Sequence, residues 1–135
     1  MNMRAEGKIA CSIWKGWKIC MTVKEFYTAI GASYDEAMSR LMNDDFAKRM
    51  LSRFPADQSY AKLAASMEGT DTDDAFTQAH TLKGLCANLS LGRLSDRVAA
   101  ITELLRGGDM DAARAMMPEV TEAYEETLKL LQEVE

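Results

Sequence analysis

From Thr22 to the end of the chain, apolar residues recur every three to four positions, which is the spacing of amphipathic helices. The period-two alternation of a half-buried strand is missing, as are the Asn-Gly and Asp-Gly pairs of tight hairpin turns. The pattern therefore predicts an all-α fold.

Capping residues and helix breakers divide this pattern into segments. Thr22 and Ser33 each stand three residues before a glutamate and are predicted N-caps of two short helices. Asn43 or Asp44 is expected to cap a third segment, which should end at Pro55 because the residue before a proline disfavours the α conformation.

Four further helices are predicted after Pro55. Their expected limits are Asp57–Ser59 to Gly69, the Asp71–Asp74 cluster to Leu91–Gly92, Leu94 to Gly107–Gly108, and Asp109 to Val134. Pro118 should kink or restart the last of them. Short loops between the long segments favour antiparallel neighbours, so we expect an up-and-down antiparallel four-helix bundle with additional short N-terminal helices.

Residues 1–21 differ from the rest, because lysines alternate there with isoleucine and tryptophan. Two interpretations are open: a basic amphipathic interfacial segment, or a non-native or docked tail ahead of a natural start at Met21. The lysines make it a poor secretion signal. We therefore divide the chain into an N-terminal extension, 1–21, and one helical bundle domain, 22–135.

Charge and composition narrow the class of partner. Sixteen Lys and Arg against 21 Asp and Glu give a net charge of −5, which argues against nucleic-acid binding and for a protein partner or small ligand. No apolar run is long enough to predict a membrane span. Three cysteines without metal-ligand or framework spacing predict free thiols, no metal site and a cytoplasmic location.

The chain has a single histidine, His80, and the helical pattern places it opposite the apolar face of its helix. That face comprises Ala75, Ala79, Leu82, Leu85, Cys86 and Leu89. Lys83 and Ala87 should project on the outward side with His80. Gly84, one turn after His80, should leave a bare patch of backbone beside the ring. The sequence therefore predicts an exposed imidazole.

An exposed, partly neutral imidazole can accept a phosphoryl group on a ring nitrogen. Lys83 could place a positive charge beside the phosphoryl oxygens, and Gly84 could let a partner surface approach. Phe76 is either an apolar contact for that partner or part of the edge of the core. A purely structural or incidental role for His80 also remains open.

The stretch from Ala79 to Gly84, followed by Ala87 to Leu91 and Leu94, resembles the signature of histidine-containing phosphotransfer (HPt) domains of bacterial two-component phosphorelays. The resemblance spans roughly Tyr34 to Leu131. It implies that His80 is the phospho-acceptor, that Lys83 stabilises the phosphoryl group and that Gly84 gives a receiver access. Phe76 and Ala87 are then expected to contribute to partner docking.

Two positions depart from the family pattern. Ser90 stands where many members have glycine, and this change should affect only the end of the helix. Family members often orient the imidazole with a Gln or Glu from the following helix, and that position falls at or near Thr102. Thr102 is the candidate for imidazole orientation, with Glu103 or a water as substitutes.

The resemblance implies a phosphocarrier that accepts a phosphoryl group on His80 from a receiver-domain aspartate and passes it to another receiver. Expected partners are response-regulator receiver domains and a hybrid histidine kinase, and the protein is expected to be a monomer. It should need no cofactor of its own, with Mg²⁺ supplied by the receiver. Without a nucleotide-binding motif, it should lack autokinase activity.

Three other functions remain as alternatives. The first is a non-catalytic module that binds and sequesters receivers. The presence of His80, Lys83 and Gly84 together argues against it. The second is the dimerisation and acceptor domain of a sensor kinase, which would carry an acidic residue in place of Thr81. The third is a structural bundle.

Overall fold

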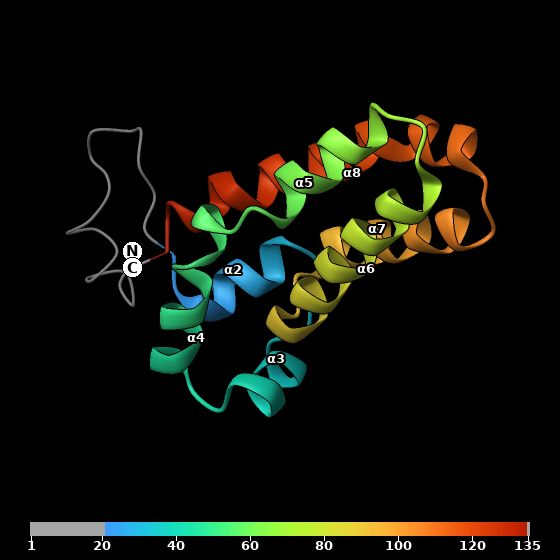
Figure 1. Cartoon of the computed structure of the whole chain (residues 1–135). Helices are drawn as coiled ribbons and strands as arrows, with labels where there is room; N and C mark the ends of the chain where they lie inside the picture. Colours follow the sequence, from blue (N-terminus) through green and yellow to red (C-terminus); the bar gives the residue numbers. More distant parts are fainter. Residues whose placement is uncertain (1–20, 135) are drawn as a thin grey trace.

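The structure, a computed structural model, describes residues 21–134 (Figure 1). Its elements are α2 (Val23–Ala29), α3 (Tyr34–Leu41), α4 (Asp44–Leu51), the 3-10 helix η2 (Phe54–Ala56), α5 (Ser59–Met67), α6 (Thr72–Leu89), α7 (Gly92–Arg106) and α8 (Met110–Leu131). Within this part of the chain the only β pairing is an isolated parallel bridge between Met21 and Val134. The predicted all-α class is confirmed.

Helices α5 to α8 form an antiparallel four-helix bundle, as predicted. Helix α6 packs against both α5 and α7, and α8 closes the bundle by contacting α7 and α5 (Figure 1). Each helix buries an apolar stripe in one continuous core. Because α6 contacts helices on two sides, its backbone is held firmly while its outward side stays open.

The short N-terminal helix α2 fixes the end of α6 and the turn that follows it. The Tyr27 hydroxyl donates to Leu89 O at 2.9 Å, and Arg93 Nη2 donates to Ala29 O at 2.7 Å. Gly92 lies in the left-handed region with φ +55°, and an added Cβ would stand 2.2 Å from Ile30 O. Only glycine fits there. The α6–α7 turn is thereby locked against α2.

The predicted N-caps are confirmed. Thr22 forms a complete capping box with Glu25, and Ser33 accepts from Glu36 N. The side chains of Asn43, Asp71 and Asp109 accept from the first turns of α4, α6 and α8, and Asp57 Oδ1 accepts from Ser59 N at the start of α5. Of the two candidates for the third cap, the structure selects Asn43.

The predicted end of the third segment was wrong, and of the two alternatives at Pro118, a kink or a restart, the restart does not occur. The third segment ends at Leu51, and Phe54–Ala56 form the separate 3-10 helix η2, which buries Phe54. Helix α8 continues through Pro118 without restarting. A proline inside a helix costs about 3 kcal/mol, and burial of α8 side chains on both sides of it, Ala113 before and Val120 and Ala123 after, offsets that cost.

The two interpretations of the N-terminal extension concern residues that lie, except for Met21, outside the described part. Met21 N donates to Glu133 O at 2.6 Å, so the start of the described chain lies beside its end. The division at residue 21 stays a prediction. No helix of the described chain is both long and apolar enough to cross a membrane.

Candidate functional site around His80

Helix α6 has a buried face and an exposed face, as its sequence predicted. Ala79, Leu82 and Cys86 are each 0% exposed, whereas His80, the ninth residue of this 18-residue helix, is exposed. Leu85, expected on the apolar face, is only half-buried at its edge. The sole histidine therefore projects from the middle of a well-packed helix.

The polar side chains on either side of His80 along α6 are bonded to their own helix. Thr77 Oγ1 donates to Asp73 O and Thr81 Oγ1 donates to Thr77 O, both at 3.0 Å. Such bonds to the carbonyl four residues earlier are common for helical threonines. Within residues 21–134, no hydrogen bond reaches the His80 ring. Its orientation must come from another kind of contact.

That contact is a ring stack with Phe76, one turn earlier on α6. The two ring centroids are 5.8 Å apart with an interplanar angle of 22°. Offset-stacked rings at this separation contribute about 0.5–1.5 kcal/mol beyond the area they bury. Phe76 is half-buried and packs against the core. Phe76 therefore joins the exposed imidazole to the packed interior.

Arg106, at the end of α7, lies against the same phenyl ring. Its Cζ is 5.1 Å from the Phe76 centroid, a cation–π distance. Arg106 is in turn paired with Glu103, whose Oε1 lies 3.2 Å from Arg106 Nε. Sequence reasoning missed Arg106. The sequence did contain a signal for it. Phe76 lies fifteen residues before Leu91 and Arg106 lies fifteen residues after it. In an antiparallel helix pair with Leu91 in the turn, positions at equal distances from the turn lie side by side.

Lys83 and Gly84 occupy the next turn of α6 after His80. Lys83 is half-buried, and Gly84 is exposed with no heavy atom within 4 Å of a hypothetical Cβ. The predicted bare patch next to the histidine is therefore present. The roles of Lys83 in phosphoryl stabilisation and of Gly84 in partner access stay predictions.

Thr102 does not donate to the imidazole in this structure. It is 0% exposed, and its hydroxyl donates to Val98 O at 2.7 Å. This uses its only proton, so the predicted role in orienting the ring gains no support and stays a prediction. Ala87 is half-buried, and its carbonyl accepts from Arg40 Nη1 at 3.0 Å. Its expected part in docking is likewise untested.

Cys86 lies directly behind the site on the buried face of α6. Burial, with a smaller contribution from the Asp57 carboxylate, raises the pKa of its thiol to about 12. A protonated, enclosed thiol is a poor nucleophile. Cys86 therefore contributes packing and not a nucleophile.

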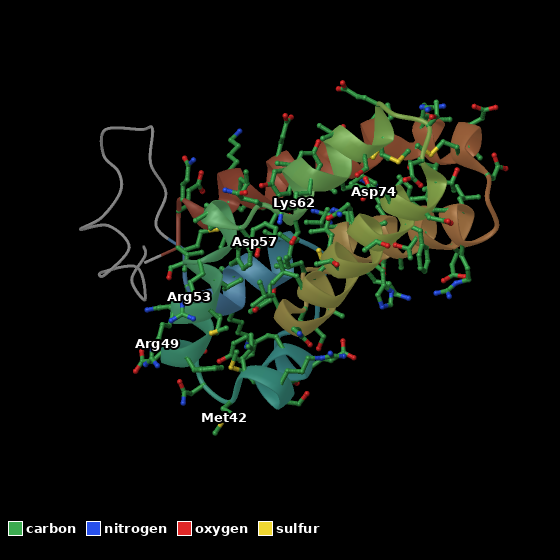
Figure 2. All side chains as sticks on the ribbon, in the orientation of Figure 1. Met42, Arg49, Arg53, Asp57, Lys62 and Asp74 are labelled. Carbon is green, nitrogen blue, oxygen red and sulfur yellow. The ribbon has the colours of Figure 1, made fainter. Side chains whose placement is uncertain are left out.

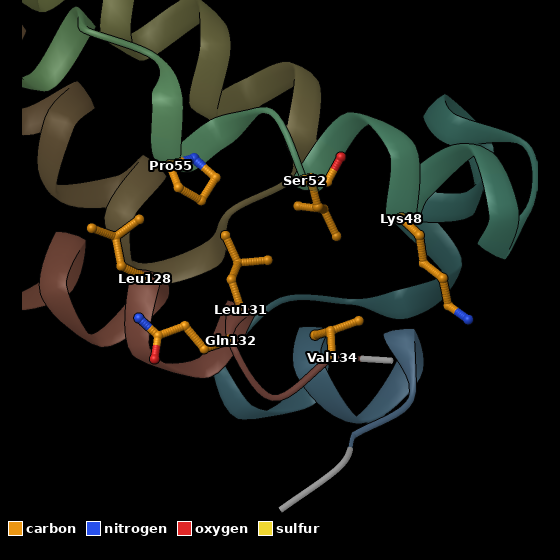
Figure 3. Close-up of a pocket in the computed structure, with 8 residues that line it drawn as sticks. Lys48, Ser52, Pro55, Leu128, Leu131, Gln132 and Val134 are labelled. Atoms are coloured by element: carbon orange, nitrogen blue, oxygen red, sulfur yellow. The ribbon is translucent and has the colours of Figure 1, made fainter. Parts of the chain in front are cut away.

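One pocket of the described chain lies away from His80. It has a volume of about 430 Å³ and opens between α4, η2 and the end of α8 (Figure 3). Its lining is mainly apolar, with Leu51, Pro55 and Leu128 among its walls, and includes no residue of α6 or α7. It cannot deliver a ligand to the imidazole.

The start of α6 is fixed to α5. Asp74 lies at the first turn of α6 (Figure 2), and its Oδ2 accepts from Ser66 Oγ at 2.5 Å. Among the described residues, no group of three or more His, Cys, Asp or Glu side chains could hold a metal ion. The site is thus a single exposed imidazole on a helix fixed at both ends.

Comparison with protein families gives one result. The family model described as Hpt domain matches residues 52–132, which is more than half of the chain and includes the whole α5–α8 bundle and His80. No curated protein and no solved structure matches the chain.

Proposed function

The chain belongs to the Hpt domain family, and from this premise we propose that His80 accepts a phosphoryl group from a receiver-domain aspartate and passes it to another receiver. Membership implies histidine phosphotransfer in a phosphorelay. The assignment to His80 is supported by one observation above all: the only histidine of the chain is exposed at the middle of a bundle helix whose other face is fully buried.

The proposed step is a displacement at phosphorus. A neutral ring nitrogen of His80 attacks the aspartyl phosphate, a nitrogen–phosphorus bond forms, and the bond from phosphorus to the carboxylate oxygen breaks. The aspartate leaves as a carboxylate, and the reverse step transfers the group to a second receiver. Lys83, three residues on, supplies positive charge to the phosphoryl oxygens.

Partners and cofactors follow from this chemistry. Hpt domains interact with receiver domains. We propose that the receivers belong to response regulators and to a hybrid histidine kinase, and that the protein acts as a cytoplasmic monomer. We also propose that it needs no cofactor of its own, because the receiver supplies the Mg²⁺ that balances charge during transfer.

Phosphotransfer from purified receivers tests this function. Receiver domains of the source organism are phosphorylated, freed of the phosphodonor and mixed with wild type, His80→Gln or the control Glu125→Gln, which changes an exposed side chain of α8. Wild type and Glu125→Gln should gain an acid-labile label that His80→Gln lacks. Equal labelling of His80→Gln, or no labelling of wild type by any receiver, would refute the proposal.

A receiver-sequestering module remains the second candidate, and one observation favours it. No polar side chain of the described chain hydrogen-bonds the His80 ring, and a docking protein has no need to orient that ring. Tight receiver binding without phosphoryl transfer in either direction would establish this alternative.

A further inference from the structure

A stack of three side chains includes two residues, Phe76 and Arg106, that have no part in the step proposed above. It consists of His80, Phe76 beneath its ring, and Arg106 from α7 against Phe76. Resting on the proposed function, we infer that Phe76 is a positioning residue that holds the His80 imidazole for transfer, and that Arg106 holds Phe76.

The contacts form a continuous path from α7 to the imidazole. Glu103 pairs with the Arg106 guanidinium on the surface of α7, and the guanidinium lies 5.1 Å from the Phe76 centroid. Phe76 packs against the core on its inner side. Held by Arg106 and by the core, the phenyl ring gives the imidazole a fixed surface to stack on.

Three hydroxyl groups that could hydrogen-bond the His80 ring donate to backbone carbonyls instead. The Thr102 hydroxyl donates to Val98 O. Thr102 lies as many residues after Leu91 as His80 lies before it, which places the two at the same level of the antiparallel pair α6 and α7. The Thr77 and Thr81 hydroxyls donate to carbonyls of α6. The stack is therefore the contact that restricts rotation of the exposed ring.

Stacking also suits the chemistry of transfer. A stacked imidazole has one face covered, while both nitrogens lie on the ring edge, where an incoming phosphoryl group can reach them. Positioning a nucleophile before the encounter removes part of the entropic barrier, and small displacements slow a reaction substantially. Loss of the phenyl ring should slow transfer about 10- to 100-fold.

The first test observes the imidazole directly. Because His80 is the only histidine, the imidazole carbon-bound protons give one set of NMR signals that need no assignment. Phe76→Leu removes the ring current and should shift these signals, whereas Phe76→Tyr should keep them near the wild-type positions. This readout does not require phosphorylation.

Phe46 offers a matched control. It is also half-buried, packs against the core and lies under an arginine, with Arg49 Cζ 5.8 Å from its centroid, but it belongs to α4. Phe46→Leu should therefore remove a comparable phenylalanine without shifting the His80 signals or slowing transfer.

The second test separates positioning from docking. With increasing receiver concentration, Phe76→Leu should lower the maximal transfer rate about 10- to 100-fold and leave the half-saturating concentration unchanged. Phe76→Tyr should restore the rate, and Arg106→Gln should lower it by a smaller factor.

The outcomes are distinct. Unshifted His80 signals in Phe76→Leu, a defect only in the half-saturating concentration, or an equal rate loss in Phe46→Leu would overturn the inference. If Phe76→Leu fails to fold, the same measurements are made on Arg106→Gln. Unshifted His80 signals, or a defect only in the half-saturating concentration, would then overturn the inference. An unlabelled wild type with shifted signals in Phe76→Leu would refute the proposed function, while the contact of Phe76 with the ring would stand.

Discussion

The two faces of α6 share one backbone and meet opposite requirements. Leu82 and Cys86 on the inner face are 0% exposed, whereas His80 and Gly84 on the outer face are open to solvent. The inner face makes the helix rigid, and the outer face has no neighbour over Gly84. On the proposed function, the buried residues of α6 carry stability and His80 carries transfer, so substitutions at Leu82 and His80 should have different effects.

The largest effect on stability is expected from the inner face. Leu82→Ala leaves a cavity in the bundle core and should lower the free energy of unfolding by about 2–5 kcal/mol, measured by urea denaturation. The labelled fraction of folded protein should not change. His80→Gln, on the outer face, should cost less than about 1 kcal/mol. Similar losses for the two variants would contradict the separation of faces.

Alkaline pH tests the inner face through Cys86. In the unfolded chain the thiol loses its proton near its ordinary pKa of 9.0, but in the fold it keeps that proton until about pH 12. Between these values the unfolded state binds fewer protons, so stability falls as pH rises, by up to about 1.4 kcal/mol per pH unit.

Urea unfolding of wild type and Cys86→Ala at a series of pH values between 8 and 10 isolates this contribution. The variant lacks the buried thiol and should lose less stability over this range, while the other titrating groups are common to both proteins. Parallel curves for the two proteins would show that Cys86 is not held protonated by the fold.

A small stability change of the opposite sign is expected at Gly84 on the outer face. Gly84→Ala adds a methyl group to an exposed helix interior with no heavy atom within 4 Å, so stability should rise by up to about 1 kcal/mol. The methyl group should also weaken receiver binding, measured by titration calorimetry. Unchanged binding would mean that Gly84 is outside the docking surface.

Much of this architecture was predictable from local sequence. N-caps such as Thr22, Asn43 and Asp71 accept hydrogen bonds from the next turn of the chain. Their residue type and spacing were therefore sufficient to predict where helices begin. The exposure of His80 followed from the helical period. Ser90, the departure from glycine, indeed falls at the end of α6, where it adopts the left-handed conformation with φ +56°.

Features that depend on distant parts of the chain could not be predicted from local sequence. Continuation of α8 through Pro118 depends on packing against α5 and α7, which no local rule contains. The stack of His80, Phe76 and Arg106 depends on the register of α6 against α7 and on side-chain rotamers. The Thr102 hydroxyl donates to a carbonyl of its own helix, and its predicted role in orienting the ring stays a prediction.

The position of the phosphoryl group tests phosphotransfer through His80 most directly. After transfer from a phosphorylated receiver, the protein is digested at alkaline pH, where phosphohistidine survives, and the modified peptide is sequenced by mass spectrometry. We predict a single phosphoryl group on His80, lost on brief acid treatment. A phosphoryl group on any other residue, or an unmodified His80 after the receiver has lost its phosphate to this protein, would contradict this prediction.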